Sequence, residues 1–312
     1  MTLNKNDLLN LKREKERVSF IAQVAVHQYG GSDAFPLYRQ AIAEALDNEP
    51  PPFDTEGYSS TYRNSALDPR WLATSILTNA EMEGDGARRL WSLATFAENG
   101  EERDLLKQHA VDESRHALYY LALLDLAFPD AIEPGFRQEL RQLSPGFSMH
   151  KELYPIEGSP YARPPTIDDY LQMNIAEIRT TIHHMMQRTA IQAYCPEENL
   201  PQALKVLDQL LDDELAHVGY TAMLIDRVAA RTPGNRVGAL FRKRFRDFNL
   251  ITTQELGDNS FGCSLECCAK REWCRAGPSA SPFSYSDAPL PDLSAEPSQG
   301  ATQAPAPAPA CH

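Results

Sequence analysis

The stretch DESRH at residues 112–116 and the stretch DELAH at residues 213–217 decide the fold of this chain. In each stretch an acidic pair is followed by a histidine three residues after the glutamate, and the flanking apolar residues recur at helical spacing. Residues three apart on an α-helix share a face, so the glutamate and the histidine lie side by side in each copy. Because that face is otherwise apolar, both pairs point towards a hydrophobic core.

Each stretch follows a helical segment that carries its own core-facing glutamate. Over residues 69–98 the apolar stripe is interrupted at Glu83, while Glu81, on a more mixed face, is the alternative. Over residues 167–194 the interruption is at Glu177. The separation of each lone glutamate from the following pair suits two antiparallel helices of about four turns and a short loop, so the side chains meet at mid-height. The basic ligand set of a predicted metal centre is Glu83, Glu113, His116, Glu177, Glu214 and His217.

Helical periodicity runs through most of the chain and predicts an all-α fold, with almost no alternating strand pattern. A loop is expected over residues 47–69, and a Pro-rich connection over residues 145–165 separates the second long helix from the third. Two long helices, a long crossover and two more long helices are typical of a ferritin-like four-helix bundle, here with flanking helices. The expected helices cover residues 5–30, 34–48, 69–98, 101–127, 167–194, 197–231 and 234–256.

The composition changes near residue 258. Residues 1–258 form the predicted ferritin-like domain. Residues 259–312 are rich in Pro, Ala and Ser, and we expect a disordered tail because such sequence buries too little apolar surface to offset its ordering entropy. The segment begins with cysteines that are not spaced as paired C-x-x-C motifs, so loose metal binding and the absence of any role both stay open. These cysteines are Cys263, Cys267, Cys268 and Cys274.

The overall charge and the N-terminal sequence exclude several classes of protein. A net charge of −13 argues against a nucleic-acid-binding surface or a polybasic membrane anchor. No run of about 18 apolar residues is present, and the charged N-terminus lacks the apolar core of a signal peptide. The sequence therefore predicts a cytoplasmic protein with no membrane and no nucleic-acid partner.

The residue types of the basic ligand set point to iron or manganese. Unpaired, each buried carboxylate would cost several kcal/mol, and two divalent or trivalent metal ions offset that charge directly. Carboxylate oxygens and imidazole nitrogens suit iron and manganese, whereas a structural zinc site usually contains thiolates. A ligating histidine also needs its second ring nitrogen held. Asp112 and Asp213 are each placed to hold the histidine of the opposite helix, and Arg115 to bridge them.

Three further residues, His184, Tyr120 and Arg179, have more than one interpretation. His184 lies two turns after Glu177 on the same stripe, so it is an extra ligand, a neighbour of the ligands or a polar core residue, with His183 exposed. Tyr120, one turn after a predicted ligand, is either a redox-active tyrosine or a packed tyrosine with a hydrogen bond. Arg179 either binds a substrate carboxylate or makes a surface ion pair.

The paired Asp-Glu-x-x-His motifs resemble those of the ferritin-like di-iron oxygenases and oxidases, over about residues 65–230. Within that superfamily the chain is most similar to the bacterial di-iron N-oxygenases, the p-aminobenzoate N-oxygenase type and its relatives that act on amino acids. The arylamine enzymes carry an extra histidine one turn before the last Glu-x-x-His, where this chain has Leu210. A seventh ligand in this chain would therefore be His184.

The resemblance implies two Fe ions, O2 as co-substrate and an external electron donor, with manganese or a mixed Mn/Fe pair suited to the same ligands. It implies N-oxygenation of a small amine or amino-acid substrate in a biosynthetic pathway. The alternatives are C–H hydroxylation, desaturation or oxidative cleavage at the same metals, and, without an organic substrate, iron storage with ferroxidase activity. A homodimer is the assembly that we consider.

Overall fold

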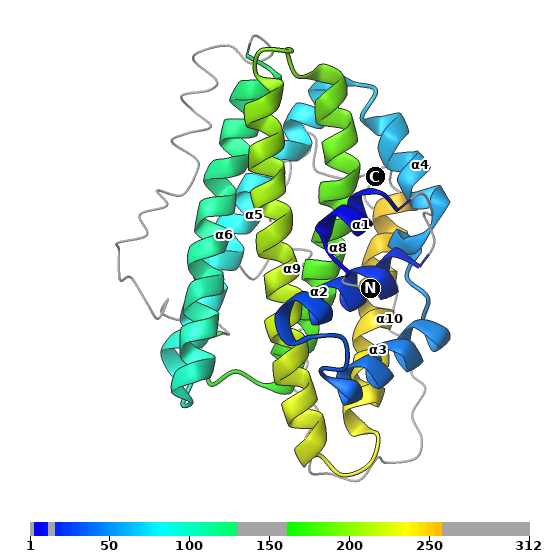
Figure 1. Ribbon diagram of the computed structural model, residues 1–312, viewed down its shortest axis with the longest axis vertical. Helices are drawn as coiled ribbons and strands as arrows, with labels where there is room; N and C mark the ends of the chain where they lie inside the picture. Colours follow the sequence, from blue (N-terminus) through cyan, green and yellow to red (C-terminus); the bar gives the residue numbers. More distant parts are fainter. Residues whose placement is uncertain (1–2, 12–15, 130–160, 258–312) are drawn as a thin grey trace, which may run out of the picture.

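The computed structural model describes residues 3–11, 16–129 and 161–257, and the regular structure in these ranges is helical, without a strand (Figure 1). This confirms the all-α prediction. No helix in the same ranges combines the length and the apolarity needed to cross a membrane. The helices are α1 (Lys5–Leu9), α2 (Arg17–Gly30), α3 (Pro36–Asn48), α4 (Glu56–Ser65), α5 (Pro69–Phe96), α6 (Gly100–Ala127), α8 (Ile167–Tyr194), α9 (Leu200–Arg231) and α10 (Arg236–Gly257), with one 3-10 turn, η1 (Pro52–Asp54). The cysteines at 263–274 and the expected tail lie outside the described residues.

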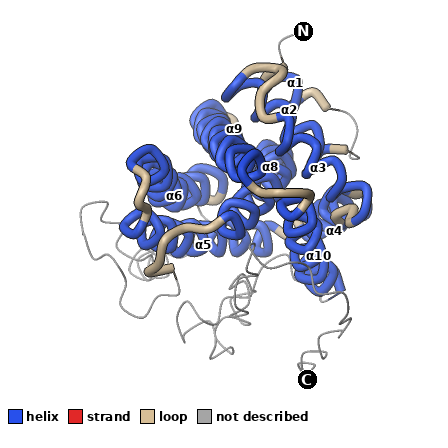
Figure 2. The backbone as a smooth tube through the Cα atoms, turned by 90° about the horizontal axis from the view of Figure 1, so that it is seen from below, coloured by secondary structure: helices blue, strands red, loops and turns tan. Residues whose placement is uncertain are grey.

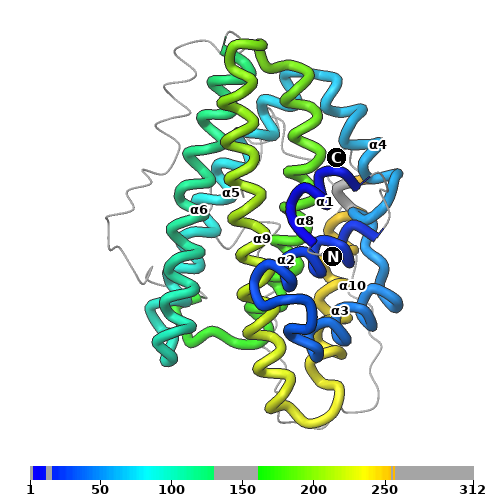
Figure 3. Tube along the Cα trace, viewed as in Figure 1, coloured from blue at the N-terminus to red at the C-terminus, as the bar shows by residue number. Residues whose placement is uncertain are grey.

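The four long helices form two antiparallel pairs, α5 with α6 and α8 with α9, and the pairs meet where α6 packs against α9. Two polar contacts show that α6 and α9 also run antiparallel. Near one end, the Asn199 side-chain amide donates to the Leu126 carbonyl. Near the other, Arg227 pairs with Glu101 at 2.8 Å. Figure 3 shows the same course along the chain.

Side-chain caps explain why the long helices begin where they do. The Asp68 side chain accepts from the Arg70 N–H at the start of α5, and Asn99 accepts from two N–H groups at the start of α6. Thr166 and Asp169 form a reciprocal capping box on α8. These caps satisfy N–H groups that have no partner within the helix. Pro201 stands in the first turn of α9, which therefore begins at residue 200 rather than at the expected residue 197.

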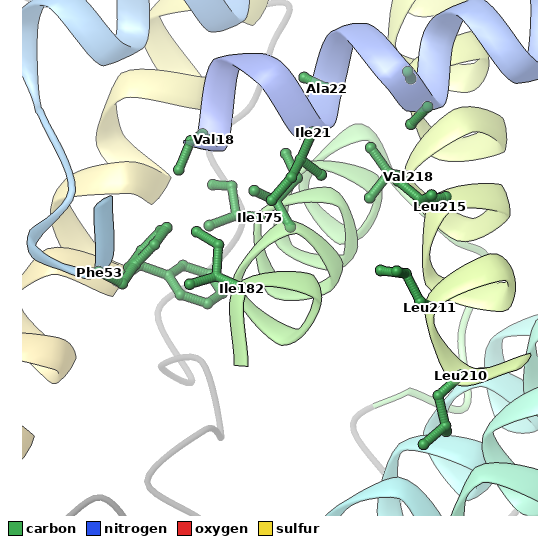
Figure 4. Packing of buried hydrophobic residues seen from close by; sticks show 14 of the residues in the cluster. Val18, Ile21, Ala22, Phe53, Ile175, Ile182, Leu210, Leu211, Leu215 and Val218 are labelled. Atoms are coloured by element: carbon green, nitrogen blue, oxygen red, sulfur yellow. The ribbon is translucent and has the colours of Figure 1, made fainter. Parts of the chain in front are cut away.

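A second layer of helices covers α8 and α9 on the side away from α5 and α6 (Figure 2). Helix α2 crosses both, and Figure 4 shows its Val18 and Ile21 among the buried side chains near Ile175 of α8 and Val218 of α9. The close approach requires Gly219, because a Cβ there would lie 2.6 Å from the Cβ of Tyr29. The outer layer therefore packs closely against α9.

Two expectations about the N-terminal region were wrong. The predicted helix over residues 5–30 is two helices, and α2 begins only at Arg17. The carboxylate of Asp54, from η1, accepts hydrogen bonds from the backbone N–H groups of Arg17 and Val18, so a distant side chain sets this boundary. The loop expected over residues 47–69 contains α4, which is capped by Thr55 and buries Tyr58 and Tyr62 on one face.

Helix α10 is tied to α8 by a buried ion pair. The Arg244 guanidinium donates to both carboxylate oxygens of Asp168 at 2.5 Å, and both side chains are at most 4% exposed. Arg246, also on α10, pairs with Glu49 at 2.5 Å but is 63% exposed. The two arginines therefore offer a matched comparison of a buried and an exposed ion pair.

Replacing Arg244 with alanine should lower the free energy of unfolding by about 3 kcal/mol, because Asp168 would stay buried without its cation. Arg246→Ala should cost less than about 1 kcal/mol, because its pair is screened by water. Urea unfolding followed by circular dichroism measures both. Equal losses in the two variants would contradict this account of how α10 is held.

Candidate metal centre

The six residues of the predicted basic ligand set converge between the four long helices. Helices α5 and α8 each contribute one glutamate, Glu83 and Glu177. Helix α6 contributes Glu113 and His116, and helix α9 contributes Glu214 and His217. Glu81 is exposed and lies outside the groups, so the geometry favours Glu83 over it. Three overlapping groups have candidate ligand atoms within 4.8 Å of one another: His109, Glu113, Glu177 and His217; Glu83, Glu113 and His116; and Glu83, His184 and Glu214.

Asp112 and Asp213 hold the two histidines reciprocally across the α6–α9 contact, as predicted. Nε2 of His116 lies 3.1 Å from the Asp213 carboxylate, and Nε2 of His217 lies 3.3 Å from the Asp112 carboxylate. Arg115 donates to both aspartates, at 2.7 and 2.8 Å. Burial raises the pKa of Asp213, but its hydrogen bonds with His116 and Arg115 outweigh this and lower the pKa to about 2. On both histidines, Nε2 is therefore held by a charged carboxylate, and this contact orients the ring.

The opposite ring nitrogens point into the carboxylates and make no hydrogen bond. Nδ1 of His116 and Nδ1 of His217 are buried without a hydrogen-bond partner, and so are both oxygens of Glu214. Nδ1 of His116 nevertheless lies 3.3 Å from one Glu214 oxygen, and Nδ1 of His217 lies 3.6 Å from the other. Buried polar atoms that lie this close together without hydrogen-bond geometry fit a set of ligands that converge on a shared cation.

Two glutamates, Glu113 and Glu214, lie at the centre of the cluster. The two oxygens of Glu214 face different histidines, as just described. Oε1 of Glu113 lies 3.6 Å from Nδ1 of both His116 and His217. Both carboxylates therefore lie between the two histidines.

His109 lies in the cluster and was missed by the sequence analysis. It is buried one helical turn before Glu113, with Nε2 3.1 Å from the Glu113 carboxylate. Nε2 also lies 3.3 Å from the Glu177 carboxylate. The signal was present in the sequence, because a residue four before Glu113 lies on the same face of α6. His109 belongs to neither Glu-x-x-His motif, so the motifs alone do not predict it.

His184 and Tyr120 form a hydrogen-bonded pair beside Glu83 and Glu214. The Tyr120 hydroxyl lies 2.5 Å from Nε2 of His184, and Nδ1 of His184 is buried without a partner. Burial, with the neighbouring charge of His116, lowers the pKa of His184 to about 3, so the imidazole is neutral at pH 7 and can bind metal. Tyr120 is thus a buried tyrosine that holds a ligand candidate, and whether it is redox-active stays a prediction.

Arg179 and His183 lie on another face of α8. Arg179 is two residues after Glu177, about 200° around the helix, so it is carried away from the carboxylates. Burial is the main cause that lowers the pKa of His183. The positive charge of Arg179 lowers this pKa further, and Arg17 makes a smaller contribution. His183 is hydrogen-bonded to the Tyr58 hydroxyl and stacks on the Tyr58 ring, so it is not the exposed histidine of the sequence interpretation. The structure does not bring Arg179 to the metal centre.

The electrostatics of the cluster show competition for protons. Burial raises the pKa of Glu113 to about 7, although a hydrogen bond with Glu83 lowers it. Burial and the charge of Glu113 raise the pKa of Glu83 as well. Burial lowers the pKa of His116, but its contacts with Asp213 and Glu214 outweigh this and raise it to about 9. In the absence of metal, protons therefore take part of the role that cations would have.

The donor chemistry fits hard or borderline divalent cations. Four carboxylates and several imidazoles, without a thiolate among the described groups, suit iron or manganese. Two divalent ions would match the four negative charges of Glu83, Glu113, Glu177 and Glu214. No protein-family model, curated protein or solved structure matches this chain. The metal centre is supported by its geometry alone.

Replacing Asp112 or Asp213 with asparagine should weaken metal binding about 10- to 100-fold. The reason is that His217 or His116, respectively, would lose the carboxylate that orients its ring. Asp212→Asn is the matched control, since Asp212 is 48% exposed and pairs with Lys5 away from the cluster. Competition with a chromophoric chelator measures the affinity for Mn(II). Equal affinities in all three variants would show that the aspartates do not support metal ligands.

Metal affinity should increase with pH between about 6 and 8.5. Without metal, His116 holds a proton up to a pKa of about 9 and Glu113 up to about 7, and a cation must displace both. Each displaced proton contributes about a tenfold change per pH unit, so the dependence should be steeper below about pH 7 than above it. Calorimetric titration with Mn(II) in two buffers of different ionisation enthalpy measures the proton release. Binding without release of protons would contradict the proton assignments.

Proposed function

We propose that this chain is a ferritin-like, non-haem di-iron oxygenase that uses O2 to oxygenate the nitrogen of a small amine or amino acid. The observation that carries the metal part is the set of buried, unpartnered atoms that face one another: Nδ1 of His116, Nδ1 of His217 and both oxygens of Glu214. The antiparallel pairs α5–α6 and α8–α9 support the ferritin-like bundle, because each contributes a lone glutamate and a Glu-x-x-His pair.

The residues that would hold the two ions fall into three sets. Glu83, His116 and His184 would hold one ion, Glu177 and His217 would hold the other, and Glu113 and Glu214 lie close to both sets. When bound, a pair of ferrous ions supplies the two electrons and the open coordination positions that O2 activation needs.

The protein's own residues orient the ligands and exclude water. The aspartates and Arg115 fix the rings of His116 and His217 from behind, while the Tyr120 hydroxyl fixes His184. The buried surroundings leave few alternative partners for the carboxylates. Held in this way, the ligands keep their positions when a substrate enters, which is the contribution that a scaffold makes to cofactor chemistry.

The choice of an amine substrate is supported by the motif resemblance and by histidine in excess of the basic six-ligand set. Arg179 lies away from the cluster, so the carboxylate of an amino-acid substrate would need a different anchor. An external electron donor would restore the ferrous state between turnovers. Manganese suits the same ligands as iron.

The full chain, loaded anaerobically with Fe(II) and mixed with O2 and a panel of amines and amino acids, should give products about 16 Da heavier, detected by mass spectrometry. Label from ¹⁸O2 should appear in the product, and Mn(II) loading should not support the reaction. Glu83→Ala should lose iron and abolish product, because Glu83 lies within both groups at its metal position. Glu81→Ala, on the exposed face of the same helix, is the control and should behave as wild type.

Other outcomes distinguish the alternatives. Rapid O2 consumption with Fe(II) and no organic product would indicate ferroxidase activity. Oxygen incorporated at carbon, or a product 2 Da lighter, would indicate hydroxylation or desaturation. Uptake of much less than about two iron ions per chain would remove the basis of the proposal.

A further inference from the structure

We propose that His109 is an additional metal ligand, positioned by Tyr220, and that it gives the Glu177 position a second imidazole. The inference rests on the proposed function in that it requires metal ions in this cluster. It goes beyond it because His109 belongs to neither Glu-x-x-His motif and is not part of the set predicted from the sequence.

The position of the imidazole carries the first step. Nε2 of His109 lies 3.1 Å from a Glu113 oxygen and 3.3 Å from a Glu177 oxygen, and the side chain is only 1% exposed. Its ring also stacks on the ring of His217, with centroids 3.7 Å apart. His109 therefore shares one compact group of ligand atoms with Glu113, Glu177 and His217.

Tyr220 holds the His109 ring on the side away from the carboxylates. Nδ1 of His109 lies 2.6 Å from the Tyr220 hydroxyl, and that hydroxyl donates to the Met173 sulfur at 3.8 Å. A tyrosine hydroxyl has one proton, so a hydroxyl that donates to the sulfur accepts the N–H of Nδ1. Without metal, Nε2 lies within hydrogen-bond distance of Glu113. A cation between the two carboxylates would take the place of a proton on Nε2, while Nδ1 keeps the N–H that Tyr220 accepts.

The same arrangement occurs at the other metal position. His184 has its Nε2 at 2.5 Å from the Tyr120 hydroxyl, and its Nδ1 is buried without a partner beside Glu83 and Glu214. With His109 included, each position has one terminal glutamate and two imidazoles. One imidazole of each position is held by an aspartate and the other by a tyrosine.

Co(II) loading of the full chain tests this without relying on catalysis. In the ¹H NMR spectrum of a Co(II) protein, each ligating histidine gives a strongly shifted, exchangeable signal from its remote N–H. Wild type should show one such signal for each of His109, His116, His184 and His217, and ¹⁵N-histidine labelling identifies them as imidazole protons. His109→Ala should lose one signal and weaken Co(II) binding at one position at least about tenfold.

Two further variants separate coordination from packing. Tyr220→Phe should retain the His109 signal but shift it and accelerate its exchange with water, because the N–H loses its acceptor. His27→Ala, at a partly buried histidine of α2, should keep every shifted signal. Should His109→Ala fail to fold, the number of signals in wild type still decides the question.

The outcomes distinguish this inference from the proposed function. Wild type that binds about two Co(II) ions, but shows no shifted imidazole signal beyond those of His116, His184 and His217, would overturn the role of His109 alone. An unchanged set of signals in His109→Ala would do the same. Wild type that binds no Co(II), Mn(II) or Fe(II) would overturn the metal centre together with this ligand.

Discussion

Four glutamates that share one buried space impose the constraint on which the rest of the molecule depends. Their charges cannot all persist in a low-dielectric interior without cations or protons. Burial raises the pKa of Glu113, so a proton on this carboxylate removes one of the four charges when no cation is bound. The unpartnered atoms of Glu214 and His116 show that protons and hydrogen bonds satisfy the cluster only in part. A pair of divalent ions would complete it.

The contact between α6 and α9 aligns the candidate ligands. Each helix contributes an aspartate to the histidine of the other, so a shift of either helix along its axis would break both contacts. Arg115 joins the two aspartates and reinforces the alignment. Groups from α5 and α8 then reach the same space from either side. Metal binding and the packing of all four helices are therefore expected to be coupled.

The outer layer supports this arrangement without contributing to the metal groups. Helix α2 packs across α8 and α9, and Gly219 permits the approach of Tyr29 two residues beyond His217. The ion pair of Arg244 with Asp168 fastens α10 to the first turn of α8. Tyr58 of α4 contacts His183 of α8, so α4 packs against α8 at this position. The outer helices therefore restrict movement of the two helices that carry Glu177, Glu214 and His217.

The sequence by itself determined the all-α class, the long helices to within a few residues, and the reciprocal roles of Asp112 and Asp213. These follow from local periodicity, local caps and three-residue spacing. The tertiary structure decided what depends on distant partners. It showed that Asp54 begins α2, that Arg179 faces away from the carboxylates, and that His109 joins them. Spacing defines the face of a single helix, but only the packing of several helices shows which side chains on that face meet.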